Sequence, residues 1–140
     1  MSENLNKLFS PVHVVETLTE AKVLDVYDTG KTFLLNSGTE FAVTLPGATG
    51  TDMAGWHATF IVKAAPSGAS YTIVSAASDI LGAVFSTEGA DADSTAGTAV
   101  DTITLVDGKS IVGDRVVLFC DGTNFYARCL VSVTAAATLS

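Results

Sequence analysis

Apolar and polar residues alternate with a period of two along much of the chain, which is typical of β-strands that bury one face. In residues 56–63, for example, every second side chain is apolar, while His57, Thr59 and Lys63 point the other way. Val, Ile, Thr, Phe and Tyr dominate these runs, and Gly, Asp, Asn and Ser separate them. The pattern predicts ten strands, at residues 12–15, 23–27, 32–35, 41–45, 56–63, 71–74, 83–85, 102–106, 115–120 and 125–133.

The rest of the chain predicts connections and ends. Residues 16–22 are expected to form one short helical turn, and residues 46–55 form a loop of small side chains. Residues 86–99 hold almost no side chain that would anchor in a core, so we expect the most mobile loop there. We predict an all-β, single-domain β-sandwich or barrel, jelly-roll-like, with an extended N-terminal arm. The arm spans residues 1–11, the β domain residues 12–134 and a featureless C-terminal tail residues 135–140.

The clearest predicted element is the last hairpin, whose strands flank Asp121-Gly-Thr-Asn124. An Asp-Gly pair supplies the positive φ angles that tight hairpin turns need. One face is entirely apolar and is assigned to the core: Val116, Leu118, Cys120, Phe125, Ala127, Cys129 and Val131. The opposite face is too apolar for free water: Val117, Phe119, Tyr126, Arg128 and Leu130. Either the hairpin is central in a two-layer stack, or its outer face is an interface.

The composition predicts that the chain contacts other proteins. Its 140 residues are 48% apolar and only 16% charged, against a typical charged fraction of about 25%. The mean hydropathy is +0.43, yet no apolar run approaches the ~18–20 residues of a membrane span. The surplus apolar surface therefore predicts an oligomer or an assembly component, with no membrane as partner.

Charge argues against a nucleic-acid partner. The formal net charge is −8, and the 7 basic residues are scattered rather than clustered as phosphate binding requires. The N-terminal sequence lacks the layout of a signal peptide, which predicts synthesis in a cytoplasm without an export signal. Cys120 and Cys129 fall about four residues out of cross-strand alignment, too far for a disulfide, so two buried thiols are expected.

Candidate chemistry is sparse. His13 and His57 lie on separate predicted strands without a nucleophile motif nearby, so we do not expect an enzyme or a small-molecule substrate. We also expect no metal and no cofactor. Glu88, Asp91 and Asp93 carry carboxylates in one loop, but without the spacing of an EF-hand. Whether that loop binds calcium stays open at this point.

Several segments together resemble a family of tailed-bacteriophage structural proteins. The run FAVTLP at residues 41–46, a Gly/Ala loop and GWHATFIV at 55–62 are followed by YTIV at 71–74 and ILGAV at 80–84. The segment GDRVVLFCDGTNFYA at 113–127 resembles the "gDxvxlxxDGtxWya" ending of these proteins, with Phe125 where Trp is usual. The resemblance covers residues 32–130 and contains no catalytic residue.

The resemblance implies a capsid decoration (cement, head-stabilising) protein. Such proteins sit as trimers on the outer surface of the assembled shell, where they clamp neighbouring major capsid proteins. A short arm and one β domain fit this class better than a tail fibre with a long shaft. The alternative is a receptor-recognition or tail-fibre/tail-tip module of a phage, which would bind host glycan or protein.

Two groups of residues are the predicted contact sites. Leu5, Leu8 and Phe9 are predicted to anchor the arm on the capsid, since exposed Leu and Phe on a free tail are a liability. The other interpretation of the arm is a frayed terminus. The predicted subunit interface of the homotrimer consists of Val117, Phe119, Tyr126 and Leu130.

Overall fold

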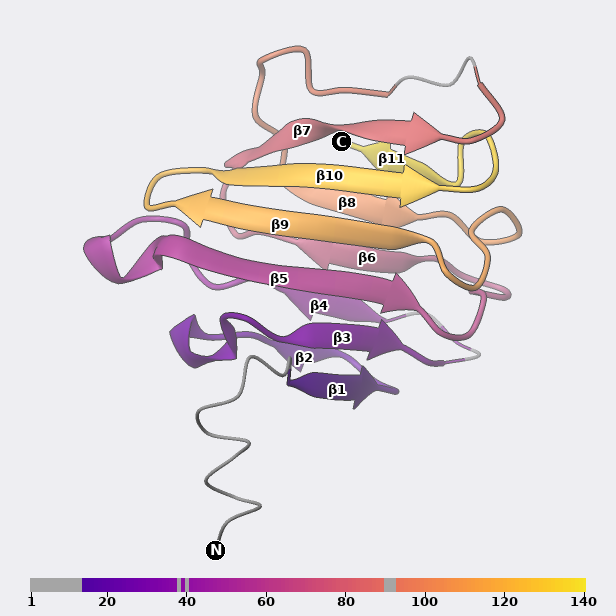
Figure 1. Cartoon of the computed structure of the whole chain (residues 1–140), viewed down its shortest axis with the longest axis horizontal. Coiled ribbons are helices and arrows are strands. Elements are labelled where there is room, and N and C mark those ends of the chain that lie inside the picture. Colours follow the sequence, from indigo (N-terminus) through magenta and orange to yellow (C-terminus); the bar gives the residue numbers. More distant parts are fainter. Residues whose placement is uncertain (1–13, 38, 40, 90–92) are drawn as a thin grey trace, which may run out of the picture.

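The computed structural model describes residues 14–37, 39, 41–89 and 93–140, which form two stacked β-sheets (Figure 1). The six-stranded sheet has the spatial order β1 (Val15–Leu18), β3 (Thr32–Leu35), β5 (Ala54–Val62), β9 (Arg115–Asp121), β10 (Phe125–Val131) and β7 (Ile80–Ser86). The five-stranded sheet has the order β11 (Ala137–Leu139), β8 (Thr102–Leu105), β6 (Tyr71–Val74), β4 (Ala42–Thr44) and β2 (Lys22–Val23). The predicted all-β sandwich is confirmed. The predicted arm, residues 1–11, lies outside the described residues.

The chain winds around the core by alternating between the sheets from β1 to β6. As a result β1, β3 and β5 are parallel neighbours, and so are β2, β4 and β6. Parallel neighbours need long crossovers, and here each crossover contains a strand of the opposite sheet. This coil is the connectivity of a β-helix. It differs from the antiparallel strand order of the jelly roll that the sequence analysis expected.

The predicted last hairpin is confirmed and lies inside the six-stranded sheet. β9 runs antiparallel to β5 and to β10, and β10 runs parallel to β7. Gly122 has φ of 94° in the hairpin turn, a conformation that glycine adopts without strain. All the side chains that the alternation assigned to the core are buried in β9 and β10. The hairpin is therefore central in the six-stranded sheet, with one face buried against the second sheet and the other face exposed.

Three aromatic pairs fill the space between the sheets. Phe33 and Phe60 are cross-strand partners whose rings stack at 5.3 Å, and the Trp56 ring meets Phe125 edge-on at 5.7 Å. Phe41 packs on Tyr71 at 4.9 Å. The buried Tyr71 hydroxyl oxygen lies 2.6 Å from the Ser37 and 2.7 Å from the Ala64 carbonyl oxygen, to one of which it donates, and it accepts from the Ser37 amide at 3.0 Å. The rings thus remove a large apolar area from water, and the Tyr71 hydroxyl keeps its hydrogen-bond partners.

The first strands are the least accurately predicted. Residues 16–22 do not form a helical turn, since β1 occupies residues 15–18. The strand predicted at 23–27 ends at Val23 and gives way to a 3₁₀ helix, η1 (Val26–Asp28). The carboxylate of Asp25 accepts from the Tyr27 amide at 2.8 Å, and that of Asp28 accepts from the Asp25 amide at 2.9 Å. This capping box stabilises a helical turn that apolar alternation does not reveal. A second 3₁₀ helix, η2 (Thr51–Met53), precedes β5.

One other expectation fails near the β7 edge, and the loop beside it has an anchor that the sequence pattern did not predict. Residues 135–140 are not featureless, because β11 pairs antiparallel with β8. In the loop at residues 86–99, Thr95 is buried, and its hydroxyl accepts from the Gly82 amide at 3.2 Å. The Val84 amide also donates to the Asp93 carbonyl oxygen at 2.8 Å. The described part of this loop therefore covers the β7 edge, as native sheets commonly cover their edges.

A cluster of ionised side chains stabilises the opposite edge, beside β1. Glu16 bonds both Lys22 and Lys31, and Lys31 also bonds Asp28 at 2.6 Å. These hydrogen bonds, that from Lys22 first, lower the pKa of Glu16, while the bond to Asp28 raises the pKa of Lys31. Burial alone would raise the pKa of Asp28, but the bonds from Lys31 and the Asp25 amide outweigh it and lower that pKa. The Lys22 ammonium also lies 5.7 Å from the centre of the Phe33 ring.

The parallel contact of β7 with β10 predicts that Gly82 tolerates no side chain. A Cβ at Gly82 would lie 2.1 Å from the Ala127 carbonyl oxygen, so Gly82→Ala is expected to destabilise the fold by about 1–3 kcal/mol. The matched control is Gly47→Ala, whose added Cβ has open space within 4 Å and which should change stability by less than about 1 kcal/mol. Urea unfolding of both variants measures the difference. Equal stability of the two would contradict this packing.

Candidate functional site

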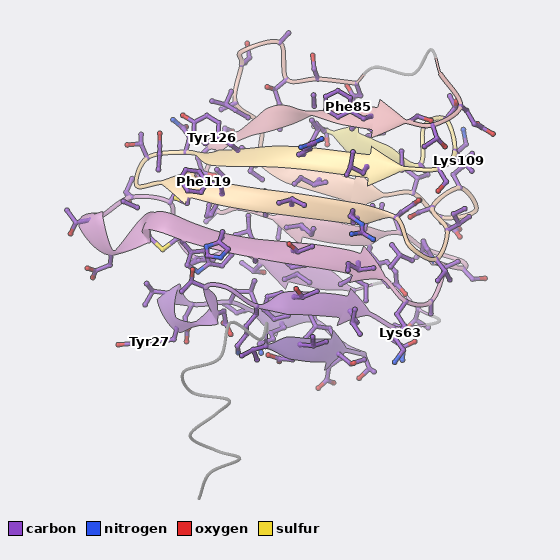
Figure 2. All side chains as sticks on the ribbon, viewed as in Figure 1. Tyr27, Lys63, Phe85, Lys109, Phe119 and Tyr126 are labelled. Carbon is purple, nitrogen blue, oxygen red and sulfur yellow. The ribbon has the colours of Figure 1, made fainter. Side chains whose placement is uncertain are left out.

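The candidate site is the outer face of the six-stranded sheet, called the outer face below. Strand register aligns its side chains in rows across the sheet. One row runs His57, Phe119, Tyr126 and Leu81, the next Thr32, Thr59, Val117, Arg128 and Ala83, and the third Leu34, Ile61, Arg115, Leu130 and Phe85. Figure 2 shows Phe85, Phe119 and Tyr126 projecting from β7, β9 and β10. The face therefore combines apolar area with few charges.

Exposed aromatic side chains are its main feature. Phe85 is 55% exposed, Phe119 48% and Tyr126 44%. Phe119 and Tyr126 are cross-strand partners, and Val117 beside them is also exposed. Large exposed apolar side chains grouped on one face mark interaction surfaces in soluble proteins.

The hairpin turn holds Tyr126 in place. Its hydroxyl donates to the Asp121 carboxylate at 2.9 Å, and the same carboxylate accepts from the Asn124 and Thr123 amides at 2.8 Å each. Bonds from the Asn124 and Thr123 amides lower the pKa of Asp121, and the Asp121 carboxylate raises the pKa of Tyr126. The ring is therefore presented to solvent in a fixed position, which reduces the entropy that a binding partner would have to remove.

Both arginines of the chain, Arg115 and Arg128, lie on the outer face. Among the described residues neither has an ion pair. The guanidinium carbon of Arg128 lies 5.9 Å from the centre of the Phe85 ring, a cation–π distance. Tyrosine, phenylalanine and arginine are the residues most enriched in protein–protein interfaces.

An open groove continues the outer face at the ends of β7, β9 and β10. It holds about 260 Å³, and its walls include Phe85, Arg115 and Leu130. The Asp114 side chain beneath it is buried and accepts from the Ser132 and Ile111 amides at 2.9 and 3.0 Å. Because these amides already bond the carboxylate, the groove presents mainly apolar walls and the Arg115 guanidinium.

The structure brings together the four residues predicted as subunit interface. Val117, Phe119 and Tyr126 are exposed and Leu130 is half-buried, all on the outer face. The arm residues Leu5, Leu8 and Phe9 lie outside the described residues. Sequence reasoning missed Phe85 and Arg115. Arg115 lies two residues before Val117 on the same strand, so the alternation of β9 could have placed it on the outer face. The pairing of Phe85 with Leu130, in contrast, depends on the parallel contact of β7 with β10.

The candidate catalytic and metal-binding side chains are dispersed or occupied. His57 is exposed on β5, and its Nδ1 lies 3.0 Å from the Gly55 carbonyl oxygen. Glu88 accepts from the Thr134 amide at 2.8 Å, and Asp93 from the Leu139 amide at 2.9 Å. Within the described residues, no group of three or more His, Cys, Asp or Glu side chains could hold a metal ion. His13 and Asp91 lie outside them.

Both cysteines are free and buried, as predicted. Burial raises the pKa of the Cys120 thiol, and burial also raises the pKa of Cys129 to about 12. The Cys120 Sγ lies 3.4 Å from the Ala48 carbonyl oxygen and 3.4 Å from the Gly122 amide nitrogen. Both thiols therefore belong to the core and contribute nothing to the outer face.

Comparison of the chain with protein-family models, with curated proteins and with solved structures gives no match in any of the three. In the part of the chain that the structure describes, no helix is long and apolar enough to span a bilayer.

The buried thiols predict slow chemical modification. At pH 8 a thiol of pKa about 12 is ionised in only about one molecule in 10⁴, and the thiolate is the reactive form. We expect neither Cys120 nor Cys129 to react with a thiol reagent within an hour in the folded protein, and both to react at once in guanidinium chloride. Mass spectrometry counts the labels. Rapid native labelling of either cysteine would contradict its burial.

Proposed function

We propose that the protein is a structural component of a tailed-phage virion. In this proposal it binds the outer surface of the assembled capsid as a homotrimer and stabilises the shell by clamping neighbouring major capsid proteins. It is made in the host cytoplasm and acts without catalysis, cofactor or metal. The observation that carries the proposal is the outer face, with its aromatic side chains and two arginines that form no ion pair with any described residue. The resemblance of residues 32–130 to phage structural proteins supplies the biological setting.

The outer face suits contact with protein for a physical reason. Its side chains stand on a paired sheet, so the backbone does not rearrange on binding. Tyr126 is already fixed by Asp121. A rigid apolar patch with aromatic anchors loses little conformational entropy when another protein covers it. This supports the predicted subunit contact through Val117, Phe119, Tyr126 and Leu130.

Stabilisation of a shell then follows from mass action. A protein that binds the assembled shell but not the dissociated subunits stabilises the assembled state by RT ln(1 + [L]/Kd) per site. At a free concentration of 100 Kd this is about 2.7 kcal/mol per site. Many equivalent sites multiply the effect, so each single contact need not be tight.

The proposal predicts the copy number of this protein in purified particles. Quantitative mass spectrometry against the major capsid protein should give a simple fraction of the capsid-protein count. A handful of copies would instead place the protein at the tail or a vertex, and would favour the receptor-recognition alternative. Absence from the particle would refute the proposed function.

The arm prediction has its own test, because Leu5, Leu8 and Phe9 are assigned to the capsid contact. Replacing all three by Ser should weaken co-sedimentation with capsids by at least about tenfold, which corresponds to about 1.4 kcal/mol. The control replaces Asn4 and Asn6 by Ser, a change in the same segment that keeps its apolar side chains. Unchanged capsid binding by the first variant would leave the arm as a frayed terminus.

A further inference from the structure

Charge is segregated on this molecule. The only carboxylate at an outward position of the six-stranded sheet is Asp121, which already bonds Tyr126 and the turn amides. The outward positions of the five-stranded sheet carry no charged residue: Val23, Ala42, Thr44, Thr72, Val74, Thr102, Thr104 and Thr138. Since the chain has a net charge of −8 and both arginines lie on the outer face, the excess of carboxylates lies elsewhere, and among the described residues most of them lie outside the strands.

The acidic side chains gather in the connections at the two ends of the strands. Glu20, Glu88 and Asp107 lie where β1, β7 and β8 finish, near the exposed Lys63 and Lys109. We call the exposed carboxylates at the opposite end, where β5 and β8 begin, the acidic rim: Asp25, Asp52 and Asp101. Asp25 caps a 3₁₀ helix, so its position is fixed. In the described residues, none of the three forms an ion pair with a lysine or arginine.

This distribution decides how a second copy can cover the outer face. Two outer faces packed together would bring four guanidinium groups into one interface, with both Asp121 carboxylates already engaged. Like charges placed opposite one another cost several kcal/mol. The back of the sandwich fits no better, because its uncharged side chains would leave Arg115 and Arg128 buried without a counter-charge. The acidic rim alone offers both carboxylates and a different surface.

We propose that the outer face of one copy packs against the acidic rim of a second copy, with Arg115 and Arg128 opposite rim carboxylates. This inference rests on the homotrimer of the proposed function and specifies its contact. The interface joins two different surfaces and is therefore heterologous, which closes into a ring when the rotation between copies allows it. Phe119 and Tyr126 supply the apolar anchor, and the arginines set the orientation.

The test measures self-association of the full chain by sedimentation equilibrium. We expect the wild type to associate beyond a dimer, and Arg128→Glu to raise its dissociation constant by at least about tenfold, because a carboxylate would then face the acidic rim. The matched control is Lys109→Glu, which changes the net charge equally at an exposed turn outside the outer face (Figure 2). This control should associate as the wild type does.

A second pair of variants tests the apolar anchor. Phe119→Glu should also loosen the assembly, whereas Val112→Glu should not, since Val112 is 64% exposed in the turn before β9, at the opposite end of the sandwich from the acidic rim. Circular dichroism and thermal melting confirm that each variant is folded. Raising NaCl from about 0.1 M to about 1 M shortens the Debye length from about 10 Å to about 3 Å, so wild-type association should weaken.

Three results would overturn the inference. A species no larger than a dimer would indicate face-to-face pairing, and a monomer at about 100 µM would remove the second copy as the occupant of the outer face. Equal effects of Arg128→Glu and Lys109→Glu would assign the effect to net charge. Capsid co-sedimentation of the same proteins separates the two proposals. If the protein is monomeric but Arg128→Glu loses capsid binding, the outer face binds the capsid, and the capsid-binding part of the proposed function stands without the homotrimer.

Discussion

The winding of the chain between two sheets is the constraint on which the rest of this structure depends. Each turn of the chain around the core adds one strand to each sheet. The same turns therefore build the parallel group β1, β3 and β5 in one sheet and the parallel group β2, β4 and β6 in the other. Strands that alternate in this way send every second side chain into one shared interior. The stacked rings of Phe33 and Phe60 follow directly, because they are register partners on adjacent coils. The opposite alternation leaves two flat outer surfaces.

Those two surfaces have different chemistry, although the same alternation produces both. The five-stranded sheet presents mostly threonine outward, whose hydroxyl groups can bond water, together with valine and alanine. The six-stranded sheet presents aromatic and aliphatic side chains with two arginines, because the β9–β10 hairpin lies in its middle. Most of the described carboxylates lie in turns or at strand ends, where Asp25 and Asp121 bond backbone amides. Turn chemistry and surface charge are therefore linked in this protein.

Local pattern was enough to predict the strands that alternate strongly, and it failed where another interaction decided the structure. The apolar faces of residues 56–63 and of the last hairpin are buried as predicted. The capping box of Asp25 and Asp28 converts a predicted strand into a helical turn, and pairing with β8 makes a strand of three residues near the C-terminus. Phe85 was missed at the candidate site because its neighbour Leu130 comes from a strand far along the chain. Pairings between distant segments are not encoded in any one segment.

The position of the hairpin in the sheet also limits when the molecule can fold. As the chain is synthesised, the strands β1 to β6 can pair with one another in the order in which they are made. Only the pairing of β5 with β9 and that of β6 with β8 wait for later strands. Strand β7 differs, because its neighbour β10 lies far along the chain from it, at residues 125–131. On the ribosome, β7 therefore waits without its partner while the apolar Ile80 and Val84 lack their final cover. Completion of the sandwich therefore waits for residues 125–131, with the delay that long-range parallel pairing brings.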